Sequence, residues 1–318
     1  MVQEKSIKKK IYVITGPTAV GKSNFAVNCA IKFNGEIVSA DSMQIYKKLN
    51  VGTAKITTEE MKGIPHHLID HLSPDESYSV GKFLCDAKLC IDEIISRNKL
   101  PIIVGGTGLY INALLNGMNL SGDSENLEIR EKWKNILSQH GKDYIFKHLL
   151  EIDPISASKI SPNDTKRVIR AIEIFESTGT PKSQIVSTSE CEYDYRFTII
   201  SDDRELLYER INLRVDKMFE LGLLDEVKSL IEYADNQSMQ AIGYKQLVEF
   251  IRGKYQNIDE VREKIKQLSR NYAKRQLTFF KGMNATNKNW IKPCDFVHEI
   301  EQINDFLGND YGNSRIDY

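Results

Sequence analysis

The stretch that most constrains this chain is residues 16–23, which read GPTAVGKS. It satisfies the eight-residue phosphate-binding loop pattern G-x-x-x-x-G-K-[ST]. In such a loop, successive backbone N–H groups face one concavity at a helix N-terminus, the lysine adds a positive charge and the hydroxyl can ligate Mg²⁺. We therefore predict that a diphosphate or triphosphate binds to the loop residues Gly16, Pro17, Thr18, Ala19, Val20, Gly21, Lys22 and Ser23, with Ser23 as the Mg²⁺ ligand.

The residues around the loop predict an α/β fold. Residues 10–15 form a short β-rich apolar run that feeds into the loop, and Phe25, Cys29 and Phe33 follow at helical spacing. Residues 36–40 and 100–106 read as two further strands, and residues 79–99 as an amphipathic helix. The pattern alone does not say whether the bound group belongs to ATP, GTP or another diphosphate.

Asp41 follows the strand at residues 36–40 directly. In an open α/β sheet the carboxyl ends of the strands face the ligand crevice, so Asp41 and the phosphate loop are predicted to share one site. An Asp in this position more often caps a turn or a helix. Residues 42–55, however, read as too long and irregular to need a cap, which favours a role in the site.

Two other segments bear on the chemistry. The strand at residues 100–106 ends in Gly105, Gly106, Thr107 and Gly108, where a nucleotide hydrolase would often place a magnesium-binding Asp. We predict that these glycines leave open backbone that can approach a ligand closely, which argues against ordinary ATP hydrolysis. His66, His67, His71 and Asp70 cluster after Pro65, but no other ligand group completes a metal site. We interpret that cluster as a polar loop near the crevice.

The texture of the chain changes from about residue 120. Through residue 190 the apolar positions follow helical spacing, opening at Gly122 and Asp123 and closing at residues 179–181, which predicts an all-helical insertion. Residues 195–201 return to strand, and residues 204–222 and 261–281 read as helices. The second helix aligns four cations that could suit phosphates, although a solvated face is the commoner explanation: Arg262, Lys266, Arg270 and Lys274.

Composition excludes several classes of protein. The 318 residues carry 43 Lys and Arg against 44 Asp and Glu, so the chain is not a globally basic nucleic-acid binder. Its five cysteines form no C-x-x-C pair and read as reduced thiols. No signal-peptide pattern or long apolar span is present, and we expect a soluble, cytoplasmic protein without a membrane partner.

Taken together, eight blocks resemble one family, the tRNA dimethylallyltransferases, also called tRNA isopentenyltransferases. They occur in family order across most of the chain, at residues 16–23, 39–55, 63–70, 105–110, 163–173, 210–227, 241–246 and 271–281. The resemblance implies a P-loop-type parallel sheet core flanked by helices, formed by residues 8–119 and 196–318. It also implies that the all-helical insertion, residues 120–195, contacts the tRNA anticodon stem-loop.

The resemblance implies transfer of a dimethylallyl group from dimethylallyl diphosphate to N6 of adenosine 37, in tRNAs that read codons beginning with U. On this view the loop holds the donor's diphosphate with Mg²⁺, and ATP is not a substrate. Ser23 stands where many relatives have Thr, and either hydroxyl can meet Mg²⁺. No zinc finger pattern follows residue 281, which resembles the bacterial form, and we expect a monomer.

The resemblance also implies individual roles. Asp41 is expected to be the general base, Lys22 and an Arg from residues 210–227 are expected to stabilise the leaving diphosphate, and Thr107 to line the channel. Arg210 and Arg214 are both candidates for that Arg. The residues expected to contact tRNA are Asp41, Ser42, Met43, Gln44, Thr107, Lys166, Arg167, Val168, Ile169, Arg170, Gln240, Ala241, Ile242, Gly243, Tyr244, Lys245, Arg270 and Lys274.

Two other functions fit parts of the pattern. A small-molecule or nucleotide kinase would use the same phosphate loop and would transfer phosphate from ATP. A non-catalytic RNA-binding switch would change its RNA affinity with nucleotide, and it would tolerate Asp41→Asn.

Overall fold

The computed structural model describes residues 8–117, 126–185 and 191–308. The chain divides into two compact units, residues 1–115 with 191–318, and residues 116–190. The second unit ends before the predicted boundary at residue 195, because the chain has already entered a strand of the first unit at Tyr193. The predicted opening of the insertion at Gly122 and Asp123 lies outside the described residues.

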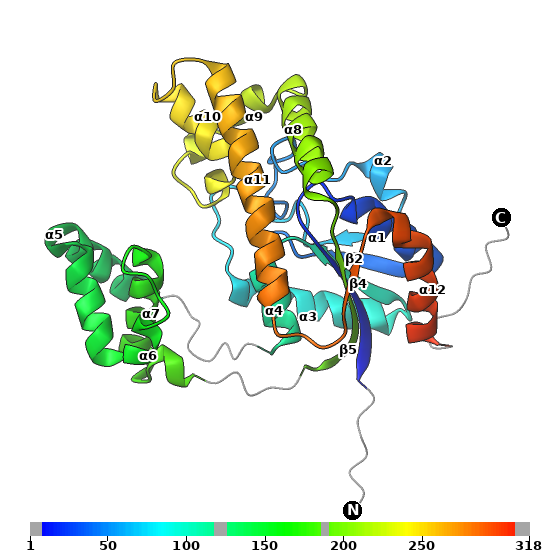
Figure 1. Cartoon of the computed structure of the whole chain (residues 1–318), viewed down its shortest axis with the longest axis horizontal. Helices are drawn as coiled ribbons and strands as arrows, with labels where there is room; N and C mark the ends of the chain where they lie inside the picture. The colour runs from blue at the N-terminus through cyan, green and yellow to red at the C-terminus, as the bar shows by residue number, and fades with distance from the viewer. Residues whose placement is uncertain (1–7, 118–125, 186–190, 309–318) are drawn as a thin grey trace, which may run out of the picture. The chain divides into compact units, whose positions relative to one another are not determined.

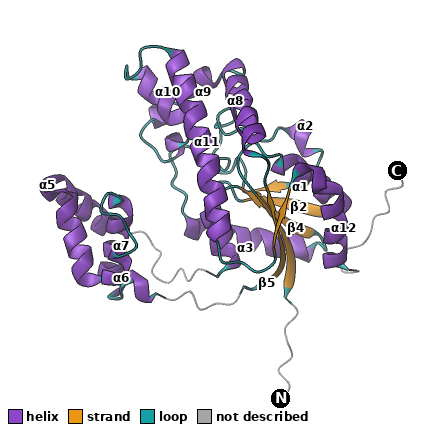
Figure 2. Cartoon of the chain, viewed as in Figure 1, coloured by secondary structure: helices purple, strands orange, loops and turns teal. Residues whose placement is uncertain are grey.

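The first unit is built on a six-stranded sheet in which every neighbouring pair is parallel (Figure 2). The strand order is β3-β2-β4-β1-β5-β6. The predicted α/β fold is therefore confirmed. The strands are β1 (Lys9–Thr15), β2 (Gly35–Ser39), β3 (His66–His67), β4 (Leu100–Gly105), β5 (Tyr193–Ile200) and β6 (Lys288–Ile291).

Helices cover both faces of this sheet (Figure 1). On one face α1 (Lys22–Lys32) and α12 (Phe296–Leu307) meet through the stacked rings of Phe25 and Phe296, 4.1 Å apart. On the other, α3 (Val80–Ser96) and α4 (Gly108–Leu115) meet through Phe83 and Tyr110, 4.3 Å apart. Burial of the sheet on both faces explains why its central strands are continuous apolar runs.

Further helices gather beyond one end of the sheet (Figure 1). There α11 (Ile258–Gly282) packs against α8 (Arg204–Glu220) and α10 (Tyr244–Ile251), and α10 packs against α9 (Leu223–Ser229). The short α2 (Thr58–Met61) lies between β2 and β3 in the chain. Since β1 runs into the phosphate loop at its carboxyl end, these elements can place side chains over that loop.

The described part of the second unit is helical, as predicted. It contains α5 (Leu127–Ile152), α6 (Pro154–Ala157) and α7 (Thr165–Thr178). At Gly141 the φ of 81° breaks the helical path of α5. Its core includes Trp133, Ile145 and Val168, and within it the fully buried Glu173 accepts hydrogen bonds from Arg130 and Arg170. In the ranges that the structure describes, none of the helices is both long and apolar enough to span a bilayer.

Candidate active site

The backbone of the phosphate loop adopts positive φ angles at two glycines. Gly16 has a φ of 147°, and a Cβ there would lie 2.2 Å from the carbonyl oxygen of Ile200. Gly21 has a φ of 96° and forms the N-cap of α1. Both positions therefore require glycine, one for space and conformation and the other for conformation. The helix begins immediately at Lys22, so its N-terminal N–H groups are available to an anion.

Lys22 points back over the loop. Its Nζ donates hydrogen bonds to the carbonyl oxygens of Gly16 and Pro17, at 3.0 and 2.7 Å. Burial and, to a smaller extent, the nearby charge of Arg214 lower the pKa of Lys22 to about 7, although the charge of Asp41 opposes the shift. The amine is therefore poised to gain a full positive charge when an anion enters the site.

The structure brings only one of the two candidate arginines to this loop. Arg214, on α8, donates from Nη1 to Thr18 Oγ1 at 3.0 Å and from Nη2 to the Thr53 carbonyl at 3.2 Å. Arg210 instead pairs with Asp202 at 2.7 Å and is not among the described residues that line the cavity. Both arginines were candidates for contacting the diphosphate, but the two side chains leave α8 toward different partners.

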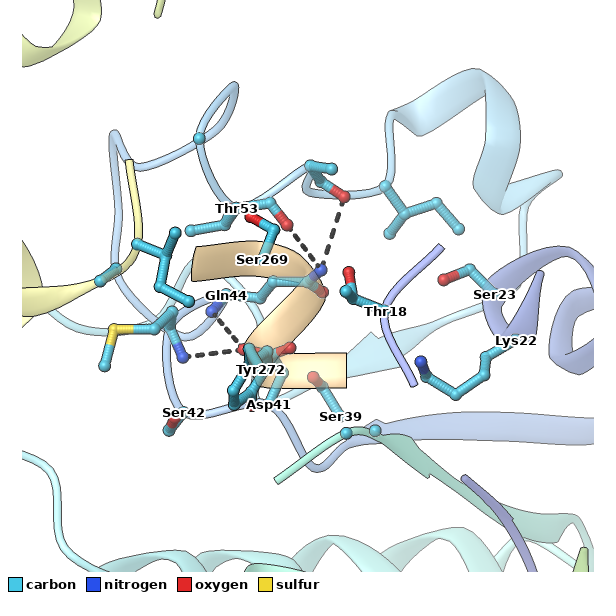
Figure 3. A pocket seen from close by; sticks show the side chains of 18 of the residues that line it. Thr18, Lys22, Ser23, Ser39, Asp41, Ser42, Gln44, Thr53, Ser269 and Tyr272 are labelled. Atoms are coloured by element: carbon cyan, nitrogen blue, oxygen red, sulfur yellow. Dashed lines mark hydrogen bonds between the residues drawn. The ribbon is translucent and has the colours of Figure 1, made fainter. Parts of the chain in front are cut away.

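Asp41 lies across the site from the loop (Figure 3). Its Oδ1 accepts hydrogen bonds from the backbone N–H groups of Met43 and Gln44, at 2.9 and 3.2 Å. Asp41 therefore does cap the turn that follows it, and the prediction that residues 42–55 need no cap is wrong. Its other oxygen, Oδ2, has no hydrogen bond within the described ranges, so the carboxylate can hold the turn and still accept a proton.

Around these groups lies a cavity of about 390 Å³. Thr18, Lys22 and Asp41 contribute polar atoms to it, and Figure 3 shows them converging with Ser23 and Ser39. Apolar side chains line much of the rest of the wall, and they belong to Ala26, Ile37, Ile56, Ile69, Val104, Ile211, Val215, Met218, Ile242 and Ile265. Polar side chains lie among the lining residues as well, including His66, Gln240 and Arg275. One cavity thus combines an anion cradle with a hydrophobic wall.

The glycines after β4 serve packing as well as access. A Cβ on Gly105 would lie 2.1 Å from the carbonyl oxygen of Ala40, and one on Gly106 would lie 2.3 Å from Nε2 of Gln276. The prediction of open backbone facing a ligand holds only in part, because both glycines line the cavity but neighbouring protein atoms occupy the space beside them. Thr107 Oγ1 accepts the N–H of Ser42 at 3.1 Å, and Thr107 is not among the described lining residues.

Sequence reasoning missed the contribution of α11. Gln276 accepts the N–H of Thr18 at 3.0 Å and donates to the carbonyl of Gly106 at 2.9 Å, so it joins the phosphate loop to the end of β4. Ile265, Ser269 and Tyr272 line the cavity from the same helix, and burial together with the charge of Asp41 raises the pKa of Tyr272. Helical spacing puts these residues on one face, but nothing in the pattern says that this face meets a cavity.

Within the histidine segment, His66 and His67 form the short strand β3, whereas Asp70 and His71 lie in the loop after it. His66 lines the cavity, and its Nδ1 contacts the carbonyl of Ile64 at 2.8 Å. His67 contacts the buried Glu36 at 2.7 Å, and Asp70 pairs with Lys55 at 2.7 Å. Among the described residues there is no group of three or more His, Cys, Asp or Glu side chains that could hold a metal ion.

The segment at residues 240–245 divides into two parts. Gln240, Ala241 and Ile242 line the cavity, as do Ser42, Met43 and Gln44 from the loop after β2. Gly243 and Tyr244 are buried, and Lys245 is exposed. Tyr244 donates from its hydroxyl to Glu226 at 2.5 Å, so this ring lies inside the protein rather than at a surface that RNA could contact.

In the second unit the predicted RNA contacts also differ in exposure. Lys166 and Arg167 are exposed on α7. Val168 and Ile169 lie in the hydrophobic core of that unit, with exposed fractions of 0% and 6%. Because α7 is amphipathic, a run of five consecutive residues cannot all face the same partner.

Two of the four cations in the basic stripe on α11 form ion pairs within the protein. Lys266 pairs with Asp216 at 2.8 Å and Glu263 at 2.9 Å, and Arg262 pairs with Asp259. Arg270 donates to Asn212 at 2.6 Å. Lys274 is exposed, and its amine makes no ion pair or hydrogen bond in the described part of the chain. The interpretation of a continuous phosphate-binding edge was therefore too broad, because Arg262 and Lys266 are paired with carboxylates. Asp216 and Asn212, the partners on α8, are distant in sequence from α11, so the pattern could not predict these contacts.

Known protein families match this chain closely. A family model described as IPP transferase matches residues 44–283, and one described as isopentenyl transferase matches residues 9–76. The tRNA dimethylallyltransferase of Oceanobacillus iheyensis is 45% identical over 309 residues, which cover 95% of this chain and 98% of that protein. That of Thermoanaerobacter sp. is 49% identical over 281 residues, covering 86% and 89%.

Solved structures agree. A tRNA isopentenylpyrophosphate transferase from Bacillus halodurans superposes with a TM-score of 0.70 at 42% identity, covering 95% of this chain and 97% of that one. A eukaryotic dimethylallyltransferase acting on tRNA superposes with a TM-score of 0.79 at 32% identity, covering 97% and 81%. The likeness extends through both units of the fold.

Proposed function

We propose a specific reaction for this chain, which belongs to the tRNA dimethylallyltransferase family. Prenyl transfer to tRNA is the activity of that family. The proposed donor is dimethylallyl diphosphate and the proposed acceptor is N6 of adenosine 37 beside the anticodon. The observation that carries the proposal is the single cavity in which Lys22 and Arg214 meet an apolar wall and the carboxylate of Asp41.

The donor fits both halves of that cavity. Its diphosphate suits the loop N–H groups, Lys22 and Arg214, which are cations and dipoles aimed at the position where negative charge develops on the leaving group. Its short branched hydrocarbon suits the apolar wall. A nucleoside triphosphate would have to place a polar ribose against that wall, so the geometry favours an isoprenoid donor over a kinase substrate.

A magnesium ion suits the donor set around Ser23. The hydroxyl of Ser23 lies in the first turn of α1, and it lines the cavity with Asp41. Mg²⁺ prefers oxygen ligands and is usually bound by few protein groups together with substrate phosphates. Ser23 would therefore hold the ion jointly with the diphosphate oxygens. When bound, Mg²⁺ supplies positive charge that neutralises the leaving diphosphate.

Asp41 is proposed as the general base. The exocyclic amine attacks the first carbon of the prenyl group, the C–N bond forms as the C–O bond to diphosphate breaks, and one N6 proton passes to the carboxylate. Because Oδ1 is held by the amides of Met43 and Gln44, the orientation of Oδ2 is fixed before substrate arrives. A positioned base of this kind contributes about 10²–10⁴ in rate.

The acceptor base is proposed to enter beside residues 42–44 and 240–242. Both segments line the cavity, and they contribute the polar side chains of Gln44 and Gln240 to it. An adenine stacked in an anticodon loop is out of reach, so the base is flipped into the cavity at a cost of about a few kcal/mol. The exposed Lys166 and Arg167 of the helical unit are proposed to contact the phosphate backbone of the stem-loop.

Incubation of the protein with an unmodified anticodon stem-loop tests the reaction. With labelled dimethylallyl diphosphate and Mg²⁺ we expect label in the RNA, and with Mg²⁺ chelated we expect a much lower rate. A parallel reaction with ATP labelled on its γ-phosphate serves as the kinase control. Transfer of that phosphate to an acceptor, with no prenyl label in the RNA, contradicts the proposal.

A further inference from the structure

Glu226, on α9, lies outside the cavity lining but contacts the loop that follows β2. Its Oε2 accepts the backbone N–H groups of Asn50 and Val51, at 3.0 and 2.8 Å. Its Oε1 accepts the N–H of Gly52 at 3.2 Å. Three successive backbone amides therefore point at one carboxylate, which is the arrangement that a turn offers to an anion.

The buried hydroxyl of Tyr244 completes this set of bonds. It donates to Oε1 of Glu226 at 2.5 Å, and the ring lies directly against Gly52. A Cβ on Gly52 would lie 2.4 Å from the Tyr244 ring and 2.8 Å from Leu223, so no larger residue fits. The loop at residues 50–52 is thus held against α9 by hydrogen bonds to the Glu226 carboxylate, and against α10 by the packing of Gly52 on the Tyr244 ring.

The clamped loop reaches the site through the next residue. The carbonyl oxygen of Thr53 accepts hydrogen bonds from Arg214 Nη2 and from Gln44 Nε2, both at 3.2 Å. Thr53 is itself fixed, since its Oγ1 donates to the carbonyl of Leu49 at 2.7 Å. Among the described residues, Arg214 donates one hydrogen bond to Thr18 and one to this carbonyl, and its buried Nε has no partner.

We propose that Glu226 is a positioning residue for the diphosphate: it fixes the loop at residues 50–52 so that the Thr53 carbonyl holds Arg214 against the phosphate loop. The proposal rests on the function proposed above, because it concerns the same diphosphate. It also gives Tyr244 a role inside the protein, as the fourth donor to Glu226. Neither residue touches substrate in this account.

The test is the variant Glu226→Gln, with Asp225→Asn on the same helix as the matched control. Gln keeps the shape but loses the charge and offers one acceptor oxygen in place of two. Asp225 is 81% exposed and contacts Lys228, so its variant should bind as the parent protein does. Calorimetry with inorganic diphosphate and Mg²⁺ should show about tenfold weaker binding for Glu226→Gln, the loss typical of a charge-assisted hydrogen bond.

Steady-state kinetics distinguish a positioning role of Glu226 from a general loss of folded structure. We expect Glu226→Gln to raise KM for dimethylallyl diphosphate by about the same factor as the binding loss, with KM for the stem-loop unchanged. In an Arg214→Ala background, the added Glu226→Gln should cost nothing further, because the residue acts through Arg214. Full additivity, or parental diphosphate affinity in the single variant, overturns the proposal.

Two outcomes keep the test decisive. If Glu226→Gln is unfolded at the assay temperature, Tyr244→Phe is the second variant, because it removes only one of the four donors to Glu226 and keeps the ring against Gly52. Tyr244→Phe should still weaken diphosphate binding. Parental affinity in that variant overturns the proposal. If the parent protein itself binds no inorganic diphosphate, it is the proposed function that fails. The two failures are therefore distinguishable.

Discussion

Lys22 is the residue whose charge depends most on what the site holds. Burial and the nearby Arg214 lower its pKa to about 7, so at about pH 8 the amine of the ligand-free protein is mostly neutral. A bound diphosphate favours the charged form and raises that pKa. We expect binding of dimethylallyl diphosphate at about pH 8 to take up close to one proton, and the uptake to shrink as pH falls below 7.

Calorimetry in two buffers with different ionisation enthalpies measures this uptake. The control is Lys22→Arg, which keeps a cation that stays protonated at every pH used, so its binding should take up no proton at this position. Equal uptake by the two proteins at about pH 8, or none by the parent, contradicts the assignment.

Asp41 is the second residue for which the geometry makes a sharp prediction. Asp41→Asn keeps Oδ1 as an acceptor for the amides of Met43 and Gln44, so the turn and the thermal stability should be preserved. It removes the proton acceptor, and the single-turnover rate should fall by about 10²–10⁴ with stem-loop affinity near that of the parent. A parental rate would remove Asp41 from the chemistry.

Among individual residues, the sequence predicted those site residues that belong to a recognisable motif or follow the end of a strand. The loop pattern identified Lys22 and Gly16, and the end of a strand identified Asp41. It could not separate Arg210 from Arg214, because one helical turn between them says nothing of their partners, Asp202 and Thr18. Gln276 carries no motif of its own, since its role depends on two glycine-rich segments that are far away in the chain.

Among the elements, α12 is joined to the sheet by one buried carboxylate. Glu299, 1% exposed, accepts hydrogen bonds from Tyr12, Arg196 and Asn289 on β1, β5 and β6, and from Thr198 on β5. Glu299→Gln removes the charge facing Arg196, and the free energy of unfolding should fall by about 2–4 kcal/mol.

Urea unfolding curves measure that loss. Glu301→Gln, two residues along the same helix and 70% exposed, is the matched control and should change the free energy of unfolding by less than about 0.5 kcal/mol. Equal effects of the two variants would mean that the buried network does not anchor α12. KM for the donor should stay unchanged in both, because α12 does not line the described cavity.

The helix α11 carries two lysines that differ in their partners. Lys274 is exposed, whereas Lys266 is 13% exposed between Asp216 and Glu263. A lysine that meets a phosphate releases a counterion, so Lys274→Gln should reduce the slope of log affinity for the stem-loop against log salt by about one. Lys266→Gln should leave the slope unchanged. Equal reductions in slope would contradict the pairing described here.

The period of the apolar residues predicted which segments are helices and which are strands, but it did not predict which elements contact one another. The strands at β1, β2, β4 and β5 and the helices α3, α8 and α11 lie where the apolar pattern predicted them, because burial of one face or of both faces fixes that pattern. The short strand β3 was missed, since two residues are too few to show a period. The ion pairs between α8 and α11 depend on tertiary contact.

At the scale of the whole molecule, the first unit is a parallel sheet with the described cavity at the carboxyl ends of its strands, and the helical unit is inserted in the chain between β4 and β5. The change of texture near residue 120 predicted that insertion from the sequence. The order of strands was not predicted, because period does not encode which strands are neighbours. Because β1, β2 and β4 are parallel, the phosphate loop after β1 and Asp41 after β2 lie at the same end of the sheet, with β4 between the two strands.

The most direct measurement is the location of the transferred group on the RNA. A stem-loop with unmodified adenosine 37 is incubated with the protein, dimethylallyl diphosphate and Mg²⁺, digested to nucleosides and examined by mass spectrometry. We predict that one dimethylallyl group appears on N6 of adenosine 37, with diphosphate released in equal amount. An RNA of unchanged mass, alongside consumption of a nucleoside triphosphate by the same cavity, would contradict the account.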